Sequence, residues 1–355
     1  MVAASDRMRW SFGTLVVIAL LLLAITTGRS SAAEFQIKTL SDTPLEFSQL
    51  DSGICTHELS GTIVRGSAEK VKEAILSLPG QDHDDKNFVI CMNSSGGNLN
   101  EGFLIGKLIF ENYFGTFVPE NAECSSACAI AFMHGFVGIY DKFKPFRMLH
   151  PNGKLGFHAP SLPISSDMTT EVPMAMVNSA YDGALKTIAQ IVDGAISSDP
   201  ETDFIPLGLL REMLRTPPDE MRYVETLHDA FSWRIDIFPE ELRAPQNFDL
   251  EVGFYQLCAN LGYAVQGATI GDRIVTKELV NLYKTTGHYT ALKSKSGYTL
   301  LKFAGQAEEQ CHFGYDKTRD RFDVFAYREG QQIGNAWLNS VYLFPPTMPL
   351  VDLAR

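Results

Sequence analysis

The sequence predicts an α/β fold with a parallel sheet and crossover helices, followed by a smaller β-rich region. Strand and helix patterns alternate between residues 54 and 133, as they do in chains built from βαβ units. The run at 88–92 is short and continuously apolar, which is typical of a strand covered on both faces. The C-terminal third instead contains alternating stretches such as 321–327. Because 355 residues exceed what one hydrophobic core usually organises, we expect two domains, 34–245 and 246–355.

The elements of the α/β part are expected in a regular order. Strands and helices alternate along the chain, with strands at 54–64, 88–92 and 115–118 and helices at 67–78, 98–113 and 126–133. Apolar residues then keep a helical period over 170–195, which predicts a long amphipathic helix that either packs on the core or serves as an oligomerisation arm. In the C-terminal part, a helix is expected near 277–284.

The N-terminus has the pattern of a secretory signal peptide. Two arginines precede an apolar run at 15–25, and the small residues Ser31 and Ala33 suit a signal peptidase. The run is shorter than the ~20 apolar residues that a membrane-spanning helix needs. We therefore assign 1–33 as a signal peptide and expect an exported, periplasmic or extracellular protein. An uncleaved signal anchor would instead tether the same domains to the membrane.

Charge and composition exclude several classes of function. The chain has 30 Lys and Arg residues against 42 Asp and Glu residues, a net charge of −12, so nucleic acid is not an expected partner. A hydrophobic content of 45% is that of a folded globular chain rather than a disordered one. The sequence has neither a Cys-x-x-Cys pair nor a His-Glu-x-x-His motif, so it implies no metal, and nothing in it implies an organic cofactor.

The six cysteines are an even number, which favours disulfides in an exported protein. Cys258 and Cys311 lie in the C-terminal third, apart from the others, so we expect them to pair with each other. Cys124 is expected to pair either locally with Cys128 or with Cys91, which lies just before a Gly-Gly turn.

Two short motifs carry the chemistry of the α/β part. The first, Asn93-Ser-Ser-Gly-Gly97, follows the buried strand and opens a helix, so its glycines let backbone N–H groups turn toward the crevice at the carboxyl end of the strand. The second motif places Ser126 at the start of an apolar helix, where the helix dipole and the amide of Ala127 favour a developing negative charge. On residue pattern alone, Ser126 is either a helix N-cap or a nucleophile.

Together, the two motifs resemble those of the serine peptidases of the Clp protease proteolytic subunit and signal peptide peptidase A superfamily, which have a crotonase-like fold. Ser94-Ser-Gly-Gly97 is similar to the turn that supplies an oxyanion amide, and Ser125-Ser-Ala127 is similar to the nucleophile segment. The likeness is closest to a group of periplasmic Clp-like proteins. It implies a crotonase-like α/β domain, Ser126 as nucleophile, the amides of Gly97 and Ala127 as the oxyanion hole, and a homo-oligomer.

The same resemblance nominates the remaining catalytic residues. The segment Leu155-Gly-Phe-His-Ala-Pro160 is similar to the one that carries the base of the Clp subunit, which nominates His158, with His150 as the alternative. Asp219, at the entry to a late helix, is nominated as the acid that orients the imidazole. A Ser-Lys dyad, as in signal peptide peptidases, would instead draw on Lys186.

These expectations define two functions of different classes. The first is an exported Clp-like serine hydrolase that cleaves a peptide or protein substrate through Ser126, His158 and Asp219 without a cofactor. The alternative is a catalytically inactive Clp-like binding or scaffold protein, which uses its C-terminal region to hold a partner. A fluorophosphonate probe that reacts with activated serines distinguishes the two.

Overall fold

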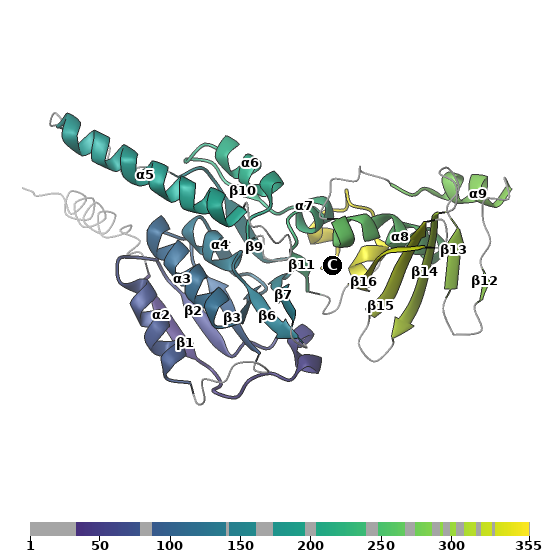
Figure 1. The fold of residues 1–355 in the computed structure, drawn as a ribbon, viewed down its shortest axis with the longest axis horizontal. Helices are drawn as coiled ribbons and strands as arrows, with labels where there is room; N and C mark the ends of the chain where they lie inside the picture. Colours follow the sequence, from purple (N-terminus) through teal and green to yellow (C-terminus); the bar gives the residue numbers. More distant parts are fainter. Residues whose placement is uncertain are drawn as a thin grey trace, which may run out of the picture. The chain divides into compact units, whose positions relative to one another are not determined.

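The structure is a computed structural model, and Glu34–Arg355 are described as one unit. Figure 1 shows the arrangement of its helices and strands. The structure describes residues 33–78, 87–139, 142–160, 173–195, 204–238, 248–266, 274–285, 292–293, 299–302, 309–316, 321–328 and 331–354. The signal peptide expected at 1–33 lies almost entirely outside these residues. Within the described ranges, no helix combines the length and the apolar content that crossing a bilayer requires.

A six-stranded sheet forms the centre of the α/β part. Its strand order is β1-β2-β3-β4-β8-β11, with bounds Gln36–Thr39, His57–Ser60, Phe88–Asn93, Phe114–Val118, Arg147–Leu149 and Asp236–Ile237. All pairs from β2 to β11 are parallel, but β1 runs antiparallel to β2. The sheet is therefore mixed, whereas the sequence predicts a parallel one. An edge strand that precedes the first βαβ unit needs no crossover helix, and this leaves its direction unconstrained.

Helix α2 (Ser67–Leu76) follows β2, and helix α3 (Leu99–Glu111) follows β3. Helix α4 (Ala127–Phe132) follows a strand of a second sheet, described below. Two glycines let α3 approach α4 closely. A Cβ atom on Gly102 would lie 2.4 Å from the carbonyl oxygen of Ala127, and one on Gly106 would lie 2.5 Å from the His134 ring. Every residue of α4 is buried, so the start of this helix has a fixed place in the core.

A second, smaller sheet carries the segments on which the chemistry depends. It has the strand order β10-β9-β5, with bounds Arg222–Tyr223, Lys154–Phe157 and Glu123–Ser125. Strands β5 and β9 are parallel, and β10 pairs antiparallel with β9. Strands β6 (Phe136–Ile139) and β7 (Lys142–Pro145) form a separate hairpin.

The long helix α5 (Met174–Ala195) matches the period predicted over 170–195. Its final turns enter the core, where Ile191 is 1% exposed. Its first turns instead expose an apolar stripe, with Met174, Tyr181 and Leu185 between 46% and 72% exposed. Only one end of α5 is therefore a core-packing helix, and an oligomerisation role for the other end stays a prediction.

The C-terminal region is a five-stranded antiparallel sheet packed with helices. Its strands are β12 (Leu292–Lys293), β13 (Thr299–Lys302), β14 (Glu309–Asp316), β15 (Arg321–Arg328) and β16 (Gln331–Asn339), and its helices are α8 (Leu250–Gln266) and α9 (Lys277–Thr285). Helix α8 is absent from the sequence expectation. Buried polar residues interrupt its apolar pattern: the Gln256 side chain donates to Asn260, whose own amide donates to the carbonyls of Tyr342 and Phe344.

The core does not stop at the boundary expected near 245. One cluster of buried apolar residues extends from the α/β part into the C-terminal region. The last residues return to α7 (Leu227–Ser232): the Leu227 amide donates to the Met348 carbonyl, and the Leu350 amide donates to Glu225. Phe231 stacks on Tyr342 with ring centroids 4.1 Å apart. The C-terminal segment is thus part of the packing of the whole unit.

Three disulfides cross-link the chain. Cys258 pairs with Cys311 and Cys124 pairs with its local partner Cys128, both as the sequence predicts, while Cys91 pairs with Cys55. The alternative pairing of Cys124 with Cys91 is therefore wrong. Three disulfides are typical of an oxidising environment, which fits export of the protein.

Two buried histidines make the fold sensitive to acid. His134 is enclosed by Phe103 and Phe204, and burial lowers its pKa to about 4; burial likewise lowers the pKa of His57 to about 4. Between about pH 6.5 and 4 the unfolded chain binds protons that the folded chain does not, so stability falls with falling pH across that window. We expect His134 alone to contribute a loss on the order of 3 kcal/mol.

Urea unfolding of the protein at a series of pH values tests this expectation. The free energy of unfolding should decline from pH 6.5 to pH 4, and the decline should be smaller in the His134→Phe variant. A variant with the same pH slope as the wild-type protein would contradict the assignment.

Candidate active site

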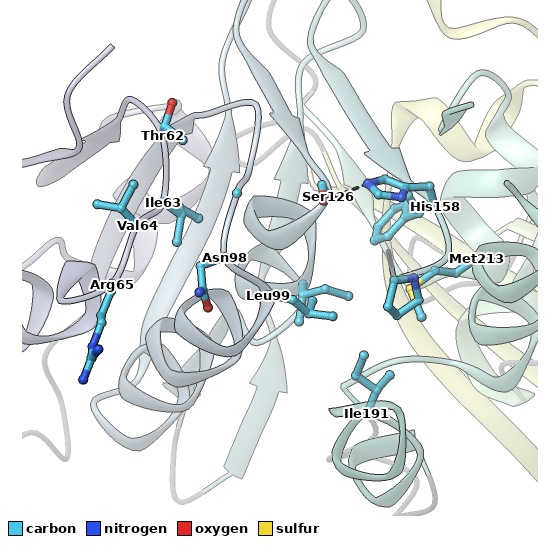
Figure 2. A pocket seen from close by; sticks show the side chains of 14 residues that line it. Thr62, Ile63, Val64, Arg65, Asn98, Leu99, Ser126, His158, Ile191 and Met213 are labelled. Carbon is cyan, nitrogen blue, oxygen red and sulfur yellow. Dashed lines mark hydrogen bonds between the residues drawn. The ribbon is translucent and has the colours of Figure 1, made fainter. Parts of the chain in front are cut away.

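The ends of two parallel strands bring a serine and a histidine together. Ser126 follows β5 and His158 follows β9, and parallel neighbours end at the same edge of a sheet. The Ser126 Oγ atom lies 2.8 Å from His158 Nε2, the bond dashed in Figure 2. Both residues are half-buried, so they are held by the core but reachable from solvent.

The His158 ring has a second contact that sets its tautomer. Its Nδ1 atom lies 2.7 Å from the carbonyl oxygen of Ala159. Because a carbonyl oxygen can only accept, Nδ1 must carry the proton, which leaves the lone pair of Nε2 free to accept the Ser126 hydroxyl proton. The Ala159 amide donates in turn to the Thr216 carbonyl at 2.9 Å, which ties this segment to the end of α6 (Leu207–Arg215).

The backbone of Ser126 has the conformation of a nucleophile elbow rather than of a helix cap. Its φ of 57° and ψ of −123° lie in a region that non-glycine residues rarely adopt. Such a conformation costs about 1–3 kcal/mol and persists only where the surrounding structure enforces it. Its side chain makes no capping hydrogen bond to α4. The strained turn instead presents Oγ to the histidine, as in strand-to-helix elbows that carry nucleophilic serines.

The Gly96-Gly97 turn packs directly against this elbow. A Cβ atom on Gly96 would lie 2.7 Å from the Cβ of Ser126 and 2.9 Å from the amide nitrogen of Ala127, and the φ of Gly96 is 93°. Hydrogen bonds tie the turn to β5: the Ser94 amide donates to the Glu123 carbonyl at 2.6 Å, and the Ser125 amide donates to the Ser94 carbonyl at 3.0 Å. Only glycine fits at position 96.

Two backbone amides near Ser126 are left without an acceptor. In the part of the chain that the structure describes, neither the Gly97 amide nor the Ala127 amide donates a hydrogen bond. Ala127 is the first residue of α4, where no intrahelical acceptor exists and the helix dipole adds positive potential. Free donors of this kind beside a serine hydroxyl that contacts an imidazole suit the stabilisation of an oxyanion.

Asp219 does not occupy the position of a triad acid. Asp219 is solvent-exposed. The His158 Nδ1 atom, the expected partner of this carboxylate, contacts the Ala159 carbonyl instead. The reason lies in the chain before it: Thr216 ends α6 in an extended conformation, and Pro217 and Pro218 continue into a turn at the surface. The segment therefore reaches the histidine through the Thr216 backbone and leaves the carboxylate in water.

The two alternative bases lie elsewhere. His150 Nδ1 accepts from the Asn152 amide at 3.1 Å, and its ring faces Phe238 at 6.4 Å. Lys186 is exposed on α5 and does not line the pocket beside Ser126. Neither residue contacts the Ser126 hydroxyl, whose imidazole partner is His158.

A pocket of about 570 Å³ opens beside the Ser126–His158 pair. Its apolar lining comes from several elements: Ile63, Leu99, Ile130, Phe157, Ile191 and Met213. In Figure 2 the side chains of Leu99, Met213 and Ile191 lie around the space next to the serine. Within the described residues, no group of three or more His, Cys, Asp or Glu side chains is placed to hold a metal ion.

A polar cluster behind the elbow is absent from the sequence expectation. The Ser125 hydroxyl donates to the Glu123 carboxylate at 2.7 Å, and the Tyr223 hydroxyl donates to the same oxygen at 3.4 Å. Burial, followed by the Glu123 charge, raises the pKa of Tyr223, so the phenol keeps its proton. The period-two spacing of Glu123 and Ser125 in β5 is the sequence signal that could have placed them on one face.

Comparisons with known proteins do not assign a function to this site. The sequence matches no protein-family model and no curated protein. Among solved structures, a mutant form of the 1510-N membrane-bound stomatin-specific protease is 13% identical, with a TM-score of 0.32, over 51% of this chain and 76% of that chain. A likeness at that level carries no functional information, so function must be inferred from the arrangement of the residues.

Proposed function

We propose that the protein is a serine hydrolase with a crotonase-like, Clp-like α/β region, and that it cleaves a peptide or protein substrate. The observation that carries this proposal is the pairing of Ser126 Oγ with His158 Nε2 at 2.8 Å, on a histidine whose Nδ1 contacts a backbone carbonyl. The proposed machinery is a Ser-His dyad oriented by the Ala159 carbonyl. Asp219 has no part in it.

The proposed reaction has two steps, acylation of Ser126 and hydrolysis of the acyl-enzyme. Ser126 Oγ attacks the scissile carbonyl carbon while its proton passes to His158 Nε2. The amides of Gly97 and Ala127 donate to the oxyanion that forms. The tetrahedral intermediate collapses, and the imidazolium gives its proton to the departing amine. A water molecule then attacks the acyl-enzyme, with His158 again as the base, and releases the acid and the free serine.

The pocket supports a peptide side chain as the group that is recognised. Its apolar lining beside Ser126 would desolvate an aliphatic or aromatic side chain next to the scissile bond. The Gly96-Gly97 turn adds backbone groups at the rim, where an extended substrate can be held. We include a homo-oligomer in this proposal, since the first turns of α5 leave apolar side chains uncovered within the described chain.

Replacing Asp219 with asparagine is expected to leave peptide hydrolysis within about twofold of the wild-type rate, because its carboxylate lies in solvent. In a Ser-His-Asp triad the same change lowers kcat by about 10⁴. Steady-state kinetics on one peptide substrate measures the difference. A loss of several orders of magnitude in a folded Asp219→Asn variant would restore the carboxylate as the orienting group.

Hydrolysis of a fluorogenic peptide library by the purified full chain tests the proposed function. We expect turnover of a subset of peptides with an apolar residue before the cleaved bond, and none by the Ser126→Ala variant. Retention of turnover after treatment with a chelator would be consistent with the serine mechanism. If peptides of the library bind but none of them is cleaved, the result would favour the scaffold alternative.

A further inference from the structure

The Cys124–Cys128 disulfide brackets the proposed nucleophile. Cys124 lies in β5, two residues before Ser126, and Cys128 lies in α4, two residues after it, with Cα atoms 5.2 Å apart. We propose that this disulfide is a positioning device that holds Ser126 in its reactive backbone conformation and directs the Ala127 amide. The inference rests on the proposed hydrolase function and adds two positioning residues to it.

The short span of the crosslink limits what the elbow can do. An extended chain would separate residues four positions apart by roughly 13 Å. A Cα distance of 5.2 Å therefore requires the chain to turn between the two cysteines, and Ser126 lies in that turn with a φ of 57°. A segment that is fully extended from Cys124 to Cys128 is therefore incompatible with an intact bridge.

The two sides of Ser126 are held in different ways. On the strand side, the Ser126 amide donates to the Gly156 carbonyl at 2.9 Å. On the helix side, the Ser126 carbonyl accepts from the Ile130 amide at 3.2 Å, while the Ala127 amide donates no hydrogen bond among the described residues and must stay free if it is to stabilise an oxyanion. A covalent link through Cys128 adds a second restraint on the direction of this amide without occupying it. The bridge thus does what a hydrogen bond at Ala127 could not.

The Cys124–Cys128 bridge is buried and lies outside the pocket, so it can act on catalysis only through the backbone around Ser126. Both sulfur-bearing side chains are 0% exposed, and neither lines the pocket beside Ser126. The Cys258–Cys311 bridge offers a matched comparison, because it joins α8 to β14 across 53 residues instead of 4. A longer closed loop removes more conformational entropy from the unfolded chain. The remote bridge should therefore matter more for stability and less for catalysis.

Two double variants separate positioning from stability. In Cys124→Ala/Cys128→Ala, we expect kcat and the rate of fluorophosphonate labelling of Ser126 to fall roughly 10- to 100-fold, with KM within about threefold. In Cys258→Ala/Cys311→Ala, we expect both rates to stay near wild type while the thermal midpoint falls further than in the first variant. Crystal structures of the first variant should show Ser126 released from its positive φ.

If the first variant does not fold, wild-type protein treated with a phosphine reductant in sub-denaturing urea, which lets the buried bridge open transiently, replaces it. The bridge gains two electrons from the phosphine and two protons from water, whose oxygen forms the phosphine oxide, and thiol mapping by mass spectrometry reports the fraction of Cys124 and Cys128 reduced. The labelling rate should fall in proportion and recover on reoxidation. Wild-type labelling rates without this bridge would overturn the inference and leave the hydrolase proposal standing. A folded, oxidised wild-type protein that never labels would overturn both.

Discussion

Replacing either Ser126 or His158 with alanine is expected to lower kcat/KM for peptide hydrolysis by roughly four to six orders of magnitude. The two side chains share one proton through a 2.8 Å contact, so removing one disables the other. The double variant should lose little more than either single variant, because residues that act as a unit have strongly non-additive effects. Steady-state kinetics of the two single variants and the double variant measures this coupling.

Two further variants serve as controls for this result. His150→Ala and Lys186→Ala remove the alternative bases, neither of which contacts Ser126 Oγ, so both should retain the wild-type rate within a few-fold. If His158→Ala keeps the full rate while Lys186→Ala is inactive, the enzyme uses a Ser-Lys dyad. Additive losses from Ser126→Ala and His158→Ala would show that the two residues do not act on the same proton.

The Gly96→Ala substitution is expected to abolish hydrolysis and destabilise the fold. Its new Cβ atom would lie 2.5 Å from the Ser125 carbonyl oxygen and 2.7 Å from the Ser126 Cβ, so the elbow must move. Gly66 provides a matched control: its φ of 88° is close to the 93° of Gly96, but a Cβ there meets nothing within 4 Å. Gly66→Ala should therefore lower the free energy of unfolding only through the strain of a left-handed alanine, by about 1–2 kcal/mol, and leave kcat unchanged.

Chemical unfolding and steady-state kinetics of the two glycine variants together check this expectation. Equal losses of stability, with activity retained in both, would mean that the contact between the Gly-Gly turn and the elbow is not needed for catalysis. Loss of activity in Gly96→Ala alone would identify the contact with Ser126 as the cause, since the backbone strain is shared by both variants.

Much of the α/β architecture can be predicted from the sequence because its signals are local. The helix expected at 67–78 is α2, and the run at 88–92 is β3, since amphipathic spacing and a short apolar run each depend on neighbouring residues. The antiparallel direction of β1 and the helix α8 could not be predicted in the same way. An edge strand has no directional signal, and the apolar pattern of α8 is broken by Gln256 and Asn260, whose partners lie far along the chain.

In the candidate site too, residues with a local sequence signal could be predicted and those without one could not. Ser126 and the Gly-Gly turn lie in short motifs, and His158 ends a strand, so their residue types and positions could be proposed from sequence. The orienting group could not, because a backbone carbonyl such as that of Ala159 has no residue signature. The family resemblance nominates Asp219 from its place at the entry to a late helix, whereas the path of the chain after Thr216 leaves this residue exposed.

Covalent labelling of the folded wild-type protein with a fluorophosphonate probe, followed by peptide mapping, tests directly whether His158 activates the Ser126 hydroxyl. Such probes form stable adducts only with a serine whose hydroxyl is activated by a base. The proposed Ser-His arrangement predicts one adduct per chain, on the peptide that contains Ser126, and none in His158→Ala. The absence of any adduct on wild-type protein with its three disulfides intact, or an adduct on another serine with Ser126 unmodified, would contradict it.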